Sequence, residues 1–181
     1  GIGVIPTTTL QQADERPLLC NFVGSAFMGS GGQRTETRKR MVAVLKSQGN
    51  PCLLEFTNGF GGRQGPMEYS GILKRSAFTL CPWGNSKETI RFYDALEAGS
   101  IPVMVKGAEF VEIFPFGPHP FVEIADWDKL PTMLNFFKNN SSALVAKQRE
   151  VVTWWRELEM FKRHEIKKFV DASFAAAEKM G

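Results

Sequence analysis

The sequence predicts an α/β fold, a doubly wound parallel sheet followed by a long C-terminal helical segment. Short apolar runs and helix-like segments alternate from residue 16 to residue 138, as in repeated strand–helix–strand units. Residues 142–179 then carry a helical pattern whose apolar stripe consists of Val151, Trp155, Leu158, Ile166 and Phe169. This alternation makes a single doubly wound domain the most economical topology.

The clearest of these units lies at residues 76–105. It consists of an apolar run at 77–81, the turn Pro82-Trp83-Gly84, a helix-like segment at 86–97, the helix stop Gly99 and a second apolar run at 101–105. In such a unit the N-terminus of the helix meets the carboxyl end of a strand. Backbone N–H groups and the helix dipole make that place suitable for an anion.

The remaining elements follow from the same patterns. Further strands are expected at 16–24, 52–56 and 120–124, and further helices at 35–48, 69–74 and 129–138. The chain therefore divides into an N-terminal tail or linker at 1–15, an α/β domain at 16–140 and a C-terminal helical extension at 141–181.

Composition excludes several classes of protein. With 43% hydrophobic and 23% charged residues the chain is an ordinary globular sequence. A net charge of +3 suits an anionic small molecule but falls short of a nucleic-acid footprint, so no nucleic acid is expected as partner. The basic run at 34–40, interrupted by Glu36, is expected to be the solvated start of a helix. No run approaches the roughly 18 apolar residues of a membrane span.

The three cysteines, Cys20, Cys52 and Cys81, each lie in an apolar strand-like run. Their spacing matches no zinc pattern, and an odd number makes no complete disulfide framework. Buried free thiols are therefore expected. The alternative is a disulfide between two of the three cysteines, which requires their strands to be neighbours.

Three loops follow the predicted strands and indicate a ligand site. Two are rich in glycine, at 24–32 and 58–66, although neither matches a nucleotide-binding fingerprint. The third spans 84–87, and all three can line one crevice at a switch point of the sheet.

The third loop and the helix after it carry the candidate ligand-binding residues. Gly84, Ser86, Lys87, Arg91 and Asp94 form this set, and Thr89 adds a second hydroxyl. An arginine in the first turns can fork onto a diphosphate, and an aspartate one turn later can accept hydrogen bonds from ribose hydroxyls. The alternative is a surface ion pair between Arg91 and Asp94 at i,i+3.

Several further motifs have structural interpretations. Asp126-Trp127-Asp128 fits a DxD metal motif, but its place before a helix favours an N-cap. His119 and His164 lack a carboxylate at ligand spacing, so no metal site is expected. The Trp154-Trp155 pair and the basic residues after it fit either an interfacial helix or a helix that crosses another part of the protein.

A family resemblance adds to these patterns. In order, the chain carries Ser76, Pro82-Trp83-Gly84, Arg91, Asp94-Ala95, Ala98-Gly99 and Ile101-Pro102-Val103. This run resembles the carboxyl-terminal half of exostosin-type glycosyltransferases, and weaker similarity extends over residues 16–138. The family often has Glu where this chain has Asp94.

The resemblance implies a Rossmann-like domain that forms one lobe of a GT-B fold and binds a nucleoside diphosphate sugar. Arg91 would bind the diphosphate, Asp94 the ribose, and the loop with Gly84, Ser86 and Lys87 would lie near the sugar or phosphate. The acceptor would be a glycan hydroxyl, with no cofactor and no essential metal. The catalytic base of such enzymes usually comes from the N-terminal lobe, so no base is assigned, and that lobe or a partner protein is expected to complete the site.

Two further expectations remain. The alternative function is a non-catalytic structural subunit that reuses the exostosin-like fold in a larger assembly. The resemblance and the overlapping glycosylation sequons at 139–142 favour a glycoprotein of the Golgi or endoplasmic reticulum lumen, anchored in the membrane by a segment outside this chain.

Overall fold

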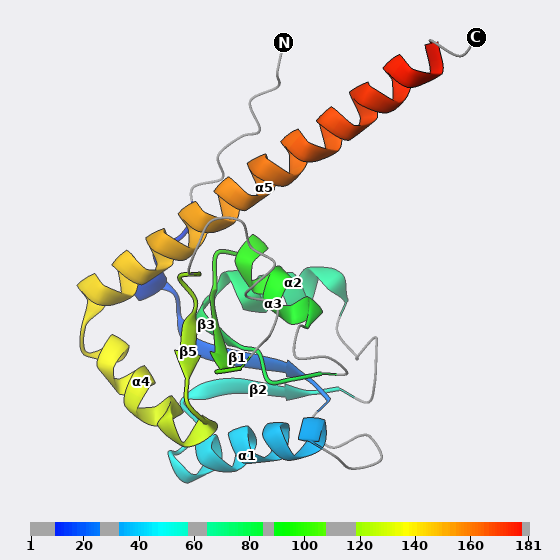
Figure 1. Ribbon diagram of the computed structural model, residues 1–181. Helices are drawn as coiled ribbons and strands as arrows, with labels where there is room; N and C mark the ends of the chain where they lie inside the picture. Colours follow the sequence, from blue (N-terminus) through cyan, green and yellow to red (C-terminus); the bar gives the residue numbers. More distant parts are fainter. Residues whose placement is uncertain (1–9, 26–32, 58–64, 85–88, 108–118, 179–181) are drawn as a thin grey trace.

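The computed structural model describes residues 10–25, 33–57, 65–84, 89–107 and 119–178 (Figure 1). Its centre is a five-stranded sheet in which every neighbouring pair is parallel, in the order β2-β1-β3-β4-β5. The strands are β1 (Leu18–Gly24), β2 (Cys52–Phe56), β3 (Ser76–Leu80), β4 (Ile101–Val105) and β5 (Val122–Ile124). The predicted α/β class and parallel sheet are confirmed.

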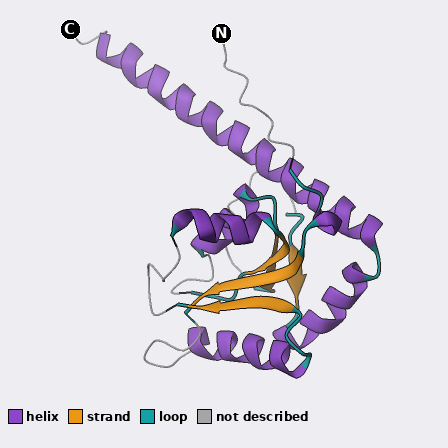
Figure 2. Cartoon of the chain, turned by 180° about the vertical axis from the view of Figure 1, so that it is seen from behind, coloured by secondary structure: helices purple, strands orange, loops and turns teal. Residues whose placement is uncertain are grey.

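Helices cover both faces of this sheet (Figures 1 and 2). On one face lie α1 (Gln33–Ser47), η3 (Trp127–Lys129) and α4 (Leu130–Lys138), and on the other lie α2 (Pro66–Lys74) and α3 (Ile90–Glu97). The chain winds outward from β1 to β2, then crosses β1 to reach β3 and continues to β4 and β5. The winding direction thus changes between β1 and β3, which defines the switch point of the sheet.

Local sequence explains these elements. All five residues of β3 are buried, as expected for a central parallel strand covered on both faces. Gly99 has a φ of 64°, so it takes the left-handed conformation that ends α3, as predicted. The core extends from Phe22 and Phe78 in the sheet to Trp127, whose Nε1 donates to Thr37 Oγ1 of α1 at 3.0 Å.

The start of the described chain packs against the end of the domain. A short 3-10 helix, η1 (Ala13–Glu15), places Ala13 in the interior, and the backbone N–H of Ala13 donates to Gln148 of α5 (Ser141–Glu178) at 2.8 Å. Arg16 is also buried and donates to the carbonyl oxygens of Ser76 and Ala98. The N-terminal segment is thus tied to α5 through Ala13 and to β3 and the end of α3 through Arg16.

The second half of α5 projects beyond the domain (Figures 1 and 2). Val151 and Leu158 of the predicted apolar stripe are buried, whereas Ile166 and Phe169 are 63% and 74% exposed. The stripe therefore extends past the surface that it packs against. Among the described residues, no helix combines the length and apolar character needed to cross a bilayer.

A disulfide joins the two strands at one side of the sheet. Cys20 and Cys52 face each other in the register of β1 and β2, with Cα atoms 4.5 Å apart, and their sulfurs are bonded. The expectation of free thiols is wrong for this pair and holds for Cys81, which is buried and free. Strand order decides the matter, because two strand residues of one sheet come within disulfide distance only when their strands are neighbours and the residues are in register.

Candidate functional site

The candidate site lies at the switch point, where β1 and β3 end and α3 begins. Thr89 is the N-cap residue of α3, with extended backbone and no side-chain cap hydrogen bond. Its Oγ1 is buried without a hydrogen-bond partner among the described residues. Arg91 is the second residue of α3, which confirms its predicted place in the first turn.

The guanidinium of Arg91 is held by the end of β1. Nε and Nη2 both donate to the carbonyl oxygen of Val23, at 3.0 and 2.6 Å, and the group lies over the ring of Phe22 at 4.7 Å. Nη1 is buried and has no hydrogen-bond partner among the described residues. Arg91 thus has a fixed position, and its Nη1 group remains available to donate to a further acceptor.

Gly24 makes this position possible. A Cβ atom built on Gly24 would overlap Nη2 of Arg91, and Gly24 has a φ of 154°. Only glycine lets the backbone pass so close to the guanidinium.

Asp94 lies one turn after Arg91 and is half-buried. Its Oδ2 accepts a hydrogen bond of 3.0 Å from the hydroxyl of Tyr69, which belongs to the neighbouring helix α2. Arg91 and Asp94 form no ion pair with each other in the described structure, so the i,i+3 alternative is not realised. Val23 holds the cation, and Tyr69 holds the carboxylate.

Two neutral groups lie beside this charged pair. Burial raises the pKa of the Cys81 thiol to about 12, and the nearby guanidinium of Arg91 offsets this only in part. Burial, and then the charge of Asp94, raises the pKa of the Tyr69 hydroxyl above its usual range. Both groups keep their protons at neutral pH, so the Tyr69 hydroxyl remains a donor to the carboxylate.

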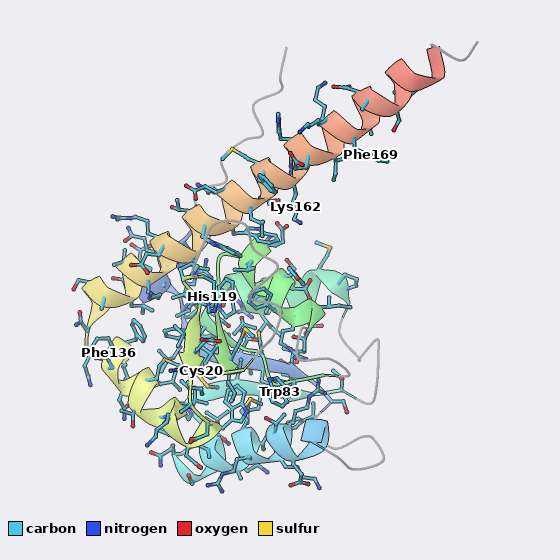
Figure 3. The ribbon with its side chains drawn as sticks, viewed as in Figure 1. Cys20, Trp83, His119, Phe136, Lys162 and Phe169 are labelled. Carbon is cyan, nitrogen blue, oxygen red and sulfur yellow. A yellow bond between two sulfur atoms is a disulfide. The ribbon has the colours of Figure 1, made fainter. Side chains whose placement is uncertain are left out.

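A second arginine reaches the switch point from the opposite face of the sheet. Arg38 of α1 is buried, and it donates from Nη1 to the carbonyl oxygen of Ser25 and from Nε to that of Trp83 at 3.0 Å (Figure 3 labels Trp83). The expectation of a solvated basic run at 34–40 is therefore wrong at Arg38. One side chain ties the chain that leaves β1 to the chain that leaves β3.

The predicted site residues are brought together only in part. Gly84, Arg91 and Asp94 follow the carboxyl end of β3 along the chain. Ser86 and Lys87 lie outside the described residues, as do 26–32 and 58–64 of the glycine-rich loops. The predicted crevice between the three loops stays a prediction.

Sequence reasoning missed Arg38 and Tyr69. Arg38 lies at helical spacing from the buried Met41, Val42 and Leu45, whereas Arg40 lies on the other side of α1, so the apolar periodicity of the helix could have separated the two arginines. Tyr69 is 25 residues from Asp94, and the contact depends on how α2 packs against α3.

The other motifs have structural roles. Asp126 is the N-cap of η3, its Oδ1 accepting from the N–H of Asp128 at 2.9 Å, which confirms the predicted cap. Asp128 pairs with Arg40 at 2.6 Å.

His119 stacks on Phe121 at 4.2 Å, on the α5 side of the sheet in Figure 3. Within the described residues no group of three His, Cys, Asp or Glu side chains is arranged to hold a metal ion.

One groove lies away from the switch point. It has a volume of about 510 Å³ and lies between Pro120 and the α5 residues Ala146, Arg149, Thr153 and Trp154. None of the predicted site residues lines it.

Comparison with known proteins gives the class and then the family. Ribitol-5-phosphate xylosyltransferase 1 from Mus musculus is 28% identical over 180 residues, and that from Homo sapiens is 27% identical over 183 residues; each match covers 89% of this chain. A probable xyloglucan galactosyltransferase from Arabidopsis thaliana is 33% identical over 89 residues, 49% of the chain and 19% of that protein. The model of the RXYLT1 C-terminal domain matches residues 2–175, so the chain belongs to this exostosin-like glycosyltransferase family.

The matched relatives are much longer than this chain. The alignments cover 39% of the mouse and human proteins. The family description places the matched region in a C-terminal domain.

Proposed function

We propose that this chain is the donor-binding domain of a glycosyltransferase, which transfers a sugar from a nucleoside diphosphate sugar to a glycan hydroxyl. The observation that carries the proposal is the fixed guanidinium of Arg91 at the switch point, with Nη1 unpartnered among the described residues. Ligands of open α/β sheets bind at this place. A guanidinium is well suited to the oxygens of a diphosphate because its donors form a rigid fork.

The start of α3 supports the same assignment. Thr89 Oγ1 is buried beside the first turn without a partner among the described residues, and the first N–H groups of a helix favour an anion. Lys87 and Ser86, with Gly84, would add a cation, a hydroxyl and close backbone approach to the phosphates. As the glycosidic bond breaks, negative charge grows on the leaving diphosphate, and Arg91 with the helix N-terminus would stabilise it.

Asp94 would bind the ribose. Oδ2 is engaged by Tyr69, and Oδ1 has no hydrogen-bond partner among the described residues. A carboxylate in this position accepts hydrogen bonds from ribose hydroxyls. Selectivity for the nucleotide would thus come from one turn of one helix.

The rest of the active site would come from outside this chain. An inverting transfer needs a base that removes a proton from the acceptor hydroxyl. We assign that base to an N-terminal lobe or a partner protein, in keeping with the greater length of the relatives. No cofactor and no essential metal enter this mechanism, because the cationic groups at α3 would neutralise the diphosphate.

The disulfide supports the proposed location. Disulfides persist in oxidising compartments such as the secretory lumen. Cys20 and Cys52 are bonded within the core, which suits folding in the lumen of the endoplasmic reticulum and residence in the Golgi, with a membrane anchor outside this chain.

Calorimetry with UDP and GDP tests the proposal. We expect one of the two to bind the purified protein, and we expect Arg91→Ala to weaken this binding at least about tenfold, the usual scale for a lost charge-assisted hydrogen bond. Arg156→Ala is the matched control, because Arg156 is exposed on α5. Unchanged affinity in a folded Arg91→Ala variant would contradict the proposal.

A non-catalytic structural subunit is the second candidate, and one observation favours it. Ile166, Phe169 and Phe174 on the projecting part of α5 are exposed, as a surface made for a partner would be. Release of nucleoside diphosphate from a donor sugar by the purified full-length protein separates the two, since a structural subunit would release none.

A further inference from the structure

Arg91 and Asp94 are spaced to neutralise each other, yet they do not. Residues at i and i+3 on a helix are neighbours, and an arginine and an aspartate there attract. Each charged group instead has a different partner, the carbonyl of Val23 for Arg91 and the hydroxyl of Tyr69 for Asp94. The two partners keep the charges apart.

Tyr69 is well placed for this role. It lies in the first turn of α2, which begins at Pro66 on the same face of the sheet as α3. Its hydroxyl donates to Oδ2 at 3.0 Å, which restrains that oxygen and leaves Oδ1 without a partner among the described residues. The raised pKa of Tyr69 means that the hydroxyl donates over the whole physiological pH range.

The surroundings make this one hydrogen bond important. The thiol of Cys81 beside the pair is fully buried and neutral, so it offers the carboxylate no competing charge. In such partly desolvated surroundings, a hydrogen bond to a charged group is stronger than in water. Without the Tyr69 hydroxyl, the carboxylate is free to turn toward Arg91.

We propose that Tyr69 is a positioning residue, which holds Asp94 away from Arg91 and thereby gives the site its preference for nucleotides with a ribose over nucleotides without ribose hydroxyls. This inference rests on the proposed donor-binding function. In it, Tyr69 touches no substrate and acts only through the orientation of the carboxylate.

The test compares Tyr69→Phe with the wild type. Calorimetry measures the affinity of the purified protein for UDP and GDP and for their 2′,3′-dideoxy forms. We expect the wild type to prefer the ribose form by about tenfold or more, the scale of lost hydrogen bonds to a charged group. Tyr69→Phe should reduce this preference to about threefold or less, mainly by weakening the ribose form, while affinity for the dideoxy form and the melting temperature change little.

A double-mutant cycle adds a second readout. Asp94→Asn should reduce the preference at least as far as Tyr69→Phe does, and the combined variant should show no further loss, because Tyr69 acts only through Asp94. The Asn variant keeps an acceptor for the Tyr69 hydroxyl, so even if Tyr69→Phe fails to fold it tests the premise that the carboxylate of Asp94 binds the ribose. An Asp94→Asn variant with wild-type preference contradicts the inference.

The possible failures are distinguishable. If a folded Tyr69→Phe variant keeps the wild-type preference, the positioning role is wrong and the donor-binding function stands. If the wild type binds neither the ribose nor the dideoxy forms, the donor-binding function is overturned, and the positioning role with it.

Discussion

The backbone of Gly24 passes directly beside Nη2 of Arg91, so close that position 24 has no room for a Cβ atom. The same guanidinium donates twice to the carbonyl oxygen of Val23, the residue before Gly24. The end of β1 therefore holds the guanidinium of Arg91 in place. A side chain at position 24 would occupy the space that the guanidinium needs.

Substitution of Gly24 tests this arrangement. Gly24→Ala should displace the guanidinium of Arg91 from the carbonyl oxygen of Val23. The affinity for a nucleoside diphosphate should then fall by about tenfold or more, because the donors of Arg91 no longer lie in position for the diphosphate oxygens. Calorimetry measures the affinity, and a thermal melt shows whether the fold persists. Gly71→Ala is the matched control, because a Cβ at Gly71 of α2 meets open space and a helical alanine stabilises by about 0.5–1 kcal/mol. Equal affinity in both variants would mean that Arg91 does not depend on Gly24.

Arg38 should matter for stability far more than Arg40 on the same helix. Arg38→Ala removes the hydrogen bonds to the carbonyls of Ser25 and Trp83 in a buried place, so we expect a loss of about 1–3 kcal/mol in the free energy of unfolding. Arg40→Ala removes an exposed ion pair with Asp128 and should change little. Denaturant unfolding of both variants gives the comparison, and similar losses would refute the bridging role of Arg38.

The disulfide predicts a thiol count and a stability change. Denatured protein without reductant should show one reactive thiol, Cys81, and three after reduction. A Cys20→Ser/Cys52→Ser double variant should lose about 2–4 kcal/mol, since the bond closes a loop across a separation of 32 residues. Titration with a thiol reagent and denaturant unfolding measure the two effects. Three reactive thiols in the unreduced protein, purified from the secretory pathway, would contradict the bond.

His119 gives the protein a pH dependence. Burial lowers the pKa of His119, and Glu123, with Oε1 3.8 Å from Nε2, opposes this only in part. The unfolded chain thus binds a proton more readily than the folded protein, so the stability contributed by neutral His119 is present above about pH 6.5 and is lost as the pH falls below it.

Melting temperatures between pH 7.5 and pH 5.5 check this sign. His119→Phe keeps the ring that stacks on Phe121 and should lose less stability on acidification than the wild type. His164→Gln, at an exposed position on α5, is the control and should follow the wild type. An identical pH dependence in His119→Phe would rule out this titration.

The overlapping sequons predict one glycan. Asn139 is exposed at the end of α4, whereas Oδ1 of Asn140 accepts from the N–H of Ala143 at 3.1 Å and caps α5. After secretory expression, Asn139→Gln should remove a mass that N-glycosidase releases from the wild type. Asn140→Gln should keep that mass but lose about 1 kcal/mol of stability with the cap. Mass spectrometry and thermal melts decide, and a wild type without glycan would count against the proposed luminal location.

The sequence alone determined the elements and their alternation. Apolar runs such as residues 77–81 and 101–105 became β3 and β4 within one residue at each end, because a strand buried on both faces leaves a continuous apolar signal. The glycine stop at Gly99 and the cap at Asp126 were also readable, since both depend on backbone conformation within a few residues. Arg91 was placed correctly at the start of α3 for the same reason.

Only the tertiary structure decided which of these residues meet. The bond between Cys20 and Cys52 requires β1 and β2 to be neighbours in register, and the contact of Tyr69 with Asp94 requires two helices on one face. Arg38 falls on the apolar face of α1, but only the packing of the sheet shows that its donors meet the carbonyl oxygens of Ser25 and Trp83. Such contacts depend on strand order and helix packing. These are set by how the whole chain buries its apolar side chains, so no single segment of the sequence predicts them.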